Sequence, residues 1–470
     1  MSNCPLSGDT KSLRDRLMLG AARPEQYLHA TSSSFLLTGL LKGSSLSVRR
    51  SELYGLSVLV ATHDQLTAAL TMIELDGCAR RITILPPDVE TDHIGAVTAA
   101  AAVDAVVIDR DSPRCAPLDL AVRVVCTPSI VSNEQAELVP LRTEWVLLTS
   151  GTVGLPKIIL HDLASLTAAA AVESPADGAA VWGTFYDIRR YGGLQIFLRA
   201  ILGGASLVLS SADEPVADHL ARLAKHGVTH ISGTPSHWRR AMMSPDLRAI
   251  APRYLRLSGE IADQAILDGL RAAFPHATIG HAYASTEAGV AFDVNDGLAG
   301  FPAAFIGEIR DGVEMKVLDG CLQIRSPRIA SRYLGTEQPA LTDSDRFVDT
   351  GDILEQRGDR YYFAGRRGGI INVGGLKIHP EEIEAVINRH PQVRMSFVRP
   401  KQSGVTGSIV VAEVVLKSEP DCVSAQQIEV RNDILKLCRE ALPRHKVPAA
   451  IRFVPTLAVA ATGKLARRQG

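Results

Sequence analysis

Short apolar runs rich in β-branched residues alternate with helical stretches over most of this chain, and this alternation restricts its fold more than any other feature. The apolar runs lie at residues 56–61, 81–85, 105–108, 122–126, 145–149, 206–209, 229–232 and 254–257. Between them, residues 64–75, 216–226 and 264–274 carry apolar side chains at the three-and-four spacing of an amphipathic helix. Because strands joined through helices pair in parallel, the pattern predicts an α/β body of layered parallel sheets.

Two changes of pattern divide the rest of the chain. Between residues 300 and 358 the predicted strands are short and punctuated by Gly and Asp, which is typical of an antiparallel or barrel-like subregion. After Gly365 a basic, glycine-rich segment precedes a stretch with its own elements: helices at 379–390 and 425–441 and strands at 370–373 and 408–416. Since 470 residues are enough for about two to four domains, we expect a large domain over residues 1–365 and a small, mobile α+β lobe over residues 366–470.

The charge balance and the cysteines exclude several kinds of partner and site. Lys and Arg (50) nearly cancel Asp and Glu (51), so no overall field favours nucleic acid or an anionic membrane. The seven cysteines are scattered without a CxxC pair or a Cys/His cluster at zinc spacing, which favours a reducing cytoplasm. We find no export signal and no apolar run long enough to span a bilayer. We expect a cytoplasmic protein without nucleic-acid or membrane partners, and its oligomeric state stays open.

A loop rich in hydroxyl groups and glycine follows one of the apolar runs. Residues 147–157 read LLTSGTVGLPK, and the glycines allow backbone N–H groups to approach an anion closely. Thr and Ser hydroxyls add neutral donors, and Lys157 supplies a compact positive charge. This composition predicts a cradle for the polyphosphate of ATP, although the same residues also form ordinary surface turns. The chain has no GxxxxGK segment followed by Ser or Thr, so a P-loop NTPase is disfavoured.

Four further segments carry residues suited to nucleotide chemistry. Residues 280–289, GHAYASTEAG, combine an aromatic ring able to stack on a base with a carboxylate able to hold magnesium. Asp352, in TGD, and Arg366 supply a carboxylate for ribose hydroxyls and a nearby guanidinium. The other two segments are INVGGLKIHPEEIE at 371–384 and ATGKL at 461–465. Taken singly, each also fits a structural role as a turn, a core aromatic or acidic groups at a helix N-terminus.

Taken in order and spacing, these five segments resemble the motifs of the adenylate-forming superfamily of acyl-CoA synthetases, peptide synthetase adenylation domains and luciferases. The resemblance covers nearly the whole chain after about Leu56, and the GGLKIHP form is most similar to bacterial aryl- and acyl-CoA ligases. It implies ATP and Mg²⁺ as cofactors and CoA as cosubstrate. The chain would then be an AMP-forming acid–thiol ligase.

The resemblance also implies roles for individual residues. Lys464 matches the lysine that the C-terminal lobe carries to the α-phosphate, where negative charge grows as pyrophosphate leaves. Thr286 and Glu287 match the positions near the α-phosphate and the magnesium ion, and Tyr283 matches the aromatic that stacks on adenine. The other positions implied in cofactor binding are Thr149, Ser150, Gly151, Thr152, Gly154 and Lys157 in the phosphate loop, Ser258, Gly259, Glu260, His281 and Ala282 in two segments that line the site, Asp352 and Arg366 at the ribose, and Gly374 and Gly375 beside a pantetheine arm.

Gly368 matches the hinge of the family, where relatives usually have Asp or Lys. Glycine accepts large changes of φ and ψ, but it offers no side chain to hold either orientation of the lobe. The lobe has to rotate between half-reactions, because the thiol must reach the acyl carbonyl on the face that Lys464 occupies. From Gly365 onward Lys and Arg (17) outnumber Asp and Glu (9), a balance that suits the phosphates of CoA and equally an ordinary solvated face.

The pocket for the carboxylic acid is the least readable part of the sequence. The matching segments carry polar and charged groups where a long acyl tunnel needs apolar ones, which favours a small polar or aromatic acid unless these groups face solvent. The residues expected in this pocket are Tyr186, Asp187, Arg190, His237 and Trp238.

The predicted reaction joins the acid to ATP as an acyl-adenylate, releases pyrophosphate and passes the acyl group to CoA. Two alternatives stay open: an adenylate donor to a carrier-protein thiol, an amine or another nucleophile, and a degenerate sensor of ATP or an acyl ligand without turnover. The presence of Lys464, Glu287 and Asp352 disfavours the sensor.

Overall fold

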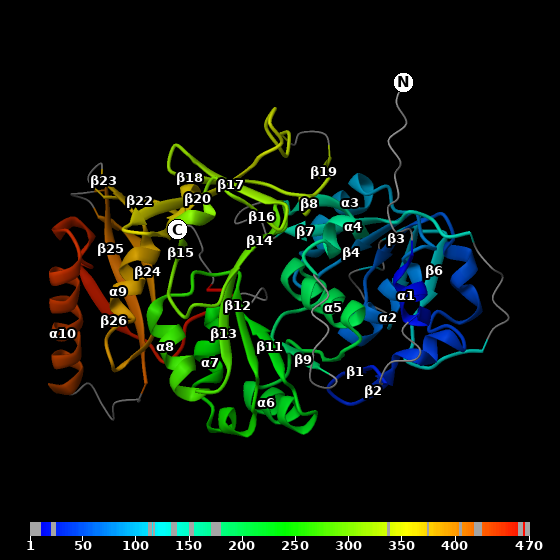
Figure 1. The fold of residues 1–470 in the computed structure, drawn as a ribbon, viewed down its shortest axis with the longest axis horizontal. Helices are drawn as coiled ribbons and strands as arrows, with labels where there is room; N and C mark the ends of the chain where they lie inside the picture. Colours follow the sequence, from blue (N-terminus) through cyan, green and yellow to red (C-terminus); the bar gives the residue numbers. More distant parts are fainter. Residues whose placement is uncertain are drawn as a thin grey trace.

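The computed structural model describes residues 11–19, 25–110, 115, 118–132, 139–149, 155–170, 180–335, 339–373, 376–403, 407–417, 425–458 and 464–465. Within these ranges the strands form sheets of eight, seven, six, three and two strands. Figure 1 shows the seven-stranded sheet at the right, the eight-stranded sheet in the middle and a smaller lobe with α9 and α10 at the left. The predicted α/β class, with parallel sheets, an antiparallel subregion and a separate C-terminal domain, is confirmed.

Two large sheets build the body, and both are mainly parallel. The seven-stranded sheet has the order β19-β8-β7-β4-β3-β5-β6, in which only β8 and β19 run antiparallel to their neighbours. Its strands are β3 (Ser57–Val60), β4 (Arg81–Ile84), β5 (Ala105–Ile108), β6 (Val122–Val125), β7 (Glu144–Thr149), β8 (Lys157–Asp162) and β19 (Arg332–Leu334). The eight-stranded sheet has the order β14-β13-β12-β11-β9-β10-β1-β2. Its strands are β1 (Tyr27–His29), β2 (Ser34–Leu36), β9 (Val181–Thr184), β10 (Ser206–Val208), β11 (His230–Gly233), β12 (Tyr254–Ser258), β13 (Thr278–Ser285) and β14 (Gly289–Val294).

Helices fill the space between the two sheets and cover their outer faces. One hydrophobic core joins α2 (Gln65–Leu75) and α5 (Tyr191–Gly203) to strands of both sheets, and every residue of α2 is buried. A second core packs the eight-stranded sheet against α6 (Val216–Lys225), α7 (Pro235–Ala241) and α8 (Gln264–Ala273). The remaining helices of the body are α1 (Leu13–Leu19), α3 (Thr91–Ala100) and α4 (Leu163–Thr167). In the described part of the chain, no helix combines the length and the apolar character needed to cross a membrane.

The six-stranded sheet is antiparallel, in the order β15-β21-β20-β18-β17-β16, and shares a further hydrophobic core with β14 of the eight-stranded sheet. Its strands are β15 (Phe301–Pro302), β16 (Ile309–Arg310), β17 (Val313–Leu318), β18 (Cys321–Arg325), β20 (Val348–Arg357) and β21 (Arg360–Arg366). Short 3₁₀ helices lie at Leu37–Leu41, Ser47–Leu53, Pro245–Ala249, Ala303–Phe305, Arg367–Gly369 and Arg444–Lys446.

The lobe has a separate core, whose buried residues begin at Ile371. Its elements are β22 (Ile371–Val373), β23 (Leu376–Ile378), α9 (Pro380–Ile387), β24 (Val393–Ser403), β25 (Gly407–Leu416), α10 (Ala425–Ala441) and β26 (Ala450–Phe453). The predicted helices and strands of the lobe are present, but the sequence did not predict β23, β24 and β26. The three-stranded sheet places β24 at an edge, beside β25.

Candidate active site

The predicted phosphate loop joins the adjacent antiparallel strands β7 and β8. Thr149, the last residue of β7, pairs with Lys157, the first residue of β8. The loop thus follows the carboxyl end of a parallel strand, the edge at which open α/β sheets bind ligands. The other predicted loop residues, Ser150, Gly151, Thr152 and Gly154, lie outside the described residues.

Lys157 faces a carboxylate from the other large sheet. Its Nζ lies 3.8 Å from Oε1 of Glu287, which follows β13, and 5.2 Å from the ring centre of Tyr333 on β19. The Tyr333 hydroxyl donates to the same Oε1 at 3.4 Å. Burial and the nearby Glu287 raise the pKa of Tyr333, so the phenol stays protonated as a donor. Tyr333 was not predicted from the sequence, because the pairing of β19 with β8 is what brings it to this site.

Thr286 is held through its backbone by a buried histidine. Nε2 of His161 on β8 donates to the Thr286 carbonyl over 2.8 Å. Burial lowers the pKa of His161 to about 4, so the ring is neutral at pH 7 with its proton on Nε2. This contact fixes the turn that carries both Thr286 and Glu287 against the strand that begins at Lys157.

Asp352 binds two of the other predicted residues. Its Oδ1 accepts from Nε of Arg366 at 2.9 Å, and its Oδ2 accepts from the Tyr283 hydroxyl at 2.5 Å. Burial and the Asp352 carboxylate raise the pKa of Tyr283. The Tyr283 ring already stacks on Phe363 at a centroid distance of 5.0 Å and on Phe292 at 5.9 Å. Its stacking on adenine stays a prediction.

These two groups of residues share one site. The carboxylate of Asp352 raises the pKa of Arg366 most strongly, and Glu287 contributes in the same direction, so the guanidinium lies within electrostatic reach of both acids. The Lys157 turn and Asp352 therefore converge, as the motif reading requires.

Lys464 reaches this site from the lobe. Its Cε lies 3.3 Å from the position that a Cβ on Gly259 would take, and Gly259 has φ +87°. Although the residue as a whole is exposed, lost hydration of the ammonium and the nearby Arg366 lower the pKa of Lys464. The groups that act on this ammonium include Glu260 and Asp352, which favour the charge, and Arg190, which opposes it.

Ser258, Ala282 and His281 lie on the paired strands β12 and β13, where Ser258 is opposite Ala282. The Ser258 carbonyl accepts from the buried Tyr186 hydroxyl at 2.7 Å. His281 Nε2 donates to the Leu298 carbonyl at 2.9 Å, and burial lowers the pKa of its ring. Of the expected pocket residues, Tyr186 therefore lies directly beside the Ser258 segment.

The charged residues after β9 do not face solvent, so that alternative is wrong. Both oxygens of Asp187 accept from Arg189, whose side chain is 4% exposed and also donates to the carbonyls of Thr62 and His63. This ion pair gives Asp187 a structural role.

Arg190 lies at the end of β7, where it forms a close ion pair with Asp88 and donates to the Leu148 carbonyl at 3.3 Å. It therefore lies next to the strand end from which the phosphate loop departs, and within electrostatic reach of the Lys464 ammonium.

His237 and Trp238 both lie on α7 but differ in exposure. The Thr234 backbone N–H donates to Nδ1 of His237 at 3.1 Å, and burial lowers the pKa of the ring to about 3, so its proton is on Nε2. Its ring stacks on Phe185 at 5.6 Å. Trp238 is fully buried between Phe274 and Phe185, and its place in the acid pocket stays a prediction. Its bulk packs α7 onto α8.

Around the hinge, Gly368 lies in the 3₁₀ helix Arg367–Gly369, and a Cβ there would meet no atom within 4 Å. The sequence did not single out the conformation of Gly365, which has φ +145° and lies so close to the lobe that a Cβ would be 2.7 Å from Glu381 Oε2. Gly374 and Gly375 lie outside the described residues.

The donors at this site fit a magnesium ion bound with a nucleotide. Mg²⁺ is usually held by one or two carboxylates together with phosphate oxygens, and Glu287 offers such a carboxylate next to the predicted phosphate loop. Among the described residues, no group of three or more His, Cys, Asp or Glu side chains could hold a metal alone. Glu287 would hold the ion, which would neutralise phosphate charge when bound.

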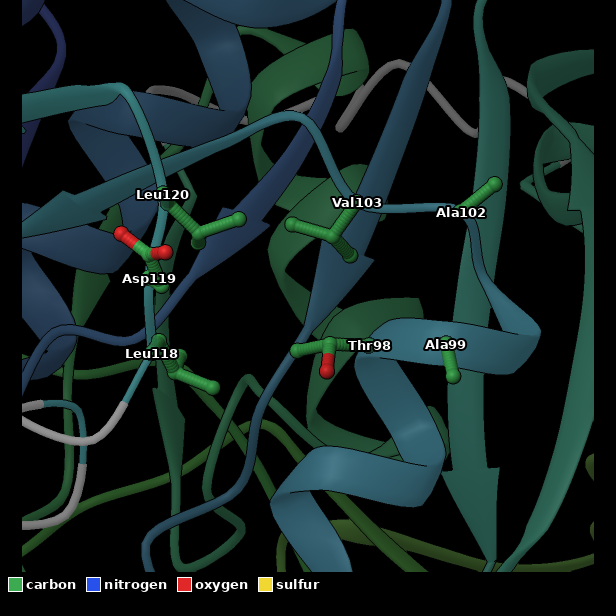
Figure 2. A pocket seen from close by; sticks show the side chains of 7 residues that line it. All are labelled: Thr98, Ala99, Ala102, Val103, Leu118, Asp119 and Leu120. Atoms are coloured by element: carbon green, nitrogen blue, oxygen red, sulfur yellow. The ribbon is translucent and has the colours of Figure 1, made fainter.

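A hollow on the outer side of the seven-stranded sheet lacks the groups for a triphosphate. Figure 2 shows Thr98 and Val103 facing Leu118 and Leu120 across it, with Asp119 and two alanines completing the lining. A lining without any cation does not suit an anionic nucleotide.

The comparison with known protein families agrees with this geometry. Residues 20–334 match the model of the AMP-binding enzyme family, and residues 382–464 match the model of the AMP-binding enzyme C-terminal domain. The chain belongs to the AMP-binding enzyme family. This is the adenylate-forming superfamily that the motifs predicted, and its members use ATP and Mg²⁺.

The relatives of this AMP-binding enzyme include both CoA ligases and peptide synthases. It is 30% identical over 291 residues to a 2-succinylbenzoate–CoA ligase of Salmonella typhimurium (strain LT2), covering 60% of each chain. It is 27% identical over 377 residues to a dimodular nonribosomal peptide synthase of Bacillus subtilis (strain 168), covering 70% of this chain and 15% of that one. The chain thus spans less than two thirds of either relative. An anthranilate CoA ligase solved with anthranoyl-AMP has the same fold, with a TM-score of 0.77 at 18% identity over 97% of this chain and 96% of that one.

Proposed function

We propose that this AMP-binding enzyme activates a small polar or aromatic carboxylic acid with Mg·ATP and transfers the acyl group to the thiol of CoA. The observation that carries the proposal is the position of the Lys464 ammonium beside Gly259, within reach of the Asp352 and Arg366 pair. A cation there stabilises the negative charge that develops when a carboxylate oxygen attacks the α-phosphorus and the bond to pyrophosphate breaks. Thiol attack on the acyl carbonyl then displaces AMP.

The body residues, together with Arg366 at the domain boundary, take the complementary roles in this proposal. Lys157 would hold the leaving phosphates, and Glu287 would hold the magnesium ion. Asp352 and Arg366 would bind the ribose, and their mutual hydrogen bond supports a site formed before the nucleotide enters. Tyr186 and His237 would line the acid pocket, where a phenol and a neutral imidazole favour a polar or aromatic acid over a fatty chain.

We also place the division between the two domains at residues 365/366, with Gly368 as the hinge. Two observations support it: the core of the lobe starts at Ile371, and a Cβ added to Gly368 would meet no atom within 4 Å. Such a hinge would let the lobe leave after adenylation.

ATP–pyrophosphate exchange with a panel of carboxylates tests this function. Benzoate, anthranilate, 4-coumarate, 2-succinylbenzoate and palmitate separate small aromatic acids from a fatty acid, and mass detection after CoA addition identifies the thioester. We expect exchange with at least one small acid, and consumption of CoA. Exchange without CoA consumption would favour a carrier-protein thiol or an amine as acceptor, as the peptide synthase relative suggests. ATP binding without exchange for any acid would favour the sensor.

A further inference from the structure

One carboxylate of the body joins the start of α7 to the chain segment that carries the lobe lysine. Oε2 of Glu260 accepts from the Ser236 N–H at 2.9 Å, and Oε1 accepts from the Ser236 hydroxyl at 3.0 Å. The same Oε1 accepts from the Leu465 N–H at 2.9 Å. We refer to Glu260 with these partners as the Glu260 bridge. Both of its oxygens are engaged, so Glu260 is occupied by protein groups at the place where the sequence suggested cofactor binding.

The bridge lies next to the contact that fixes the lysine side chain. Gly259 approaches Lys464, and the following residue Glu260 binds Leu465, so two consecutive body residues meet two consecutive lobe residues. Anchoring the Leu465 amide fixes the backbone directly after Lys464. The hydrogen bond at Leu465 and the close contact with Gly259 then together restrict the direction of the Lys464 side chain.

The charge of Glu260 also acts on the lysine. Arg366 and Arg190 both oppose a positive charge on Lys464, whereas Glu260 and Asp352 favour it. Glu260 therefore offsets repulsion that would otherwise move the ammonium away from the site.

We propose that Glu260 is the positioning residue that seats Lys464 for acyl-adenylate formation. The inference rests on the proposed function. Glu260 touches neither nucleotide nor acid in this role, and it acts through the Leu465 backbone and the ammonium. Its contribution belongs to the adenylation step, since the lobe must carry Lys464 away before a thiol can enter.

Other contacts between body and lobe provide a matched control. Asp263 accepts from the Asn388 amide at 3.2 Å, and Arg239 donates to the Arg394 carbonyl at 3.2 Å. These contacts join α7 and α8 to α9 and β24 without touching the lysine segment. Asn388→Ala loosens the same interface and leaves the Glu260 bridge intact.

Hydrogen exchange tests the bridge without any substrate. Residue-resolved deuterium uptake at the Leu465 amide is measured for the wild type, Glu260→Gln, Ser236→Ala and Asn388→Ala. Losing a charged acceptor speeds exchange of this amide roughly tenfold in Glu260→Gln, whereas Ser236→Ala and Asn388→Ala change it by less than about threefold. Equal uptake in the wild type and Glu260→Gln would overturn the proposal.

Kinetics then separate positioning from a merely structural effect. With the acid that gives exchange, Glu260→Gln slows adenylation roughly tenfold and leaves acyl transfer from the supplied acyl-adenylate to CoA within about twofold. In the Lys464→Ala background the same change adds less than about twofold, because residues that act as a unit are not additive. A full additional loss in that background would overturn the proposal. Absence of exchange in the wild type would instead refute the proposed function, while deuterium uptake still decides whether the bridge forms.

Discussion

The body and the lobe differ in how they hold the charged groups of the site. The body holds its carboxylates in pairs, with Asp352 bound by Tyr283 and by Arg366 at the domain boundary, and Glu287 near Lys157. The lobe adds the Lys464 ammonium, which is kept at the site by the backbone hydrogen bond from Leu465 to Glu260 and by a close approach to Gly259. Under the proposed function, the groups that bind the nucleotide are thus built into the larger domain, and the group that accelerates adenylation is on the smaller lobe. Changes in the body should alter affinity, and changes at the lobe contact should alter rate.

The largest expected effect comes from removing the lobe's cation. Lys464→Ala should slow pyrophosphate exchange by roughly 10²–10³, with ATP affinity and thermal stability close to those of the wild type. The matched control is Lys446→Ala, because this lobe lysine pairs with Glu382 inside the lobe at 2.6 Å. Full exchange activity in Lys464→Ala, or an equal loss in Lys446→Ala, would break the comparison.

The pH dependence of adenylation should report the same cation. Lost hydration and Arg366 lower the pKa of Lys464, so its charge is lost as pH rises through that lowered value. Above it, exchange should fall about tenfold per pH unit. In Lys464→Arg the remaining activity should persist to higher pH, because the guanidinium stays protonated there. If activity fell at the same high pH in both proteins, the loss would come from the titration of another group.

A substitution in the body should weaken nucleotide binding and leave the contact with the lobe unchanged. Asp352→Asn removes the charged acceptor shared by Arg366 and Tyr283, and should weaken ATP binding roughly tenfold in titration calorimetry. Asp349→Asn on the same strand is the control, because Asp349 pairs with the exposed Arg367 at 3.0 Å. Similar affinities for the two variants would show that Asp352 does not contact the nucleotide.

The smallest expected effect lies at the contact surface itself. In Gly259→Ala the new methyl group would stand 3.3 Å from Lys464 Cε at φ +87°, and adenylation should slow by roughly threefold to tenfold. Gly307→Ala carries the same backbone strain at φ +84° with open space around it, so it should lose about 1 kcal/mol of stability and no activity. Thermal unfolding and exchange rates measured together separate the two outcomes.

The sequence predicted the parallel strands well, because buried strands are short and rich in β-branched residues. The strand predicted at 105–108 matches β5, and that at 254–257 matches most of β12. It missed β24, which carries Pro400 and several charges that argue against a strand. Because β24 lies at the edge of its sheet, a residue without a backbone N–H is tolerated there.

The complete burial of α2 could not be predicted from the sequence either. Its spacing predicts one apolar face, yet all its residues are buried, because β3, α1 and the 3₁₀ helix Ser47–Leu53 pack around it. Glu74 on this helix is fully buried, and its oxygens accept from Ser44 and Ser45. Nothing local in the sequence indicates these partners.

The candidate site was predictable where a motif names the residue. Lys157, Glu287, Asp352, Arg366 and Lys464 converge as the motif order implied, although their individual roles stay predictions. His161, Tyr333 and the second function of Glu260 depend on contacts between elements far apart in the chain. Such residues become visible only once the sheets are assembled.

The buried Arg189 has a consequence for how acid preference can change. Its guanidinium fastens the chain after β9 to the carbonyls of Thr62 and His63, which follow β3 in the neighbouring sheet. The two large sheets are therefore joined close to Tyr186, so the backbone around the proposed acid pocket has little freedom to move apart for a larger substrate. A change of acid preference would then depend on substituting the side chains that line the pocket.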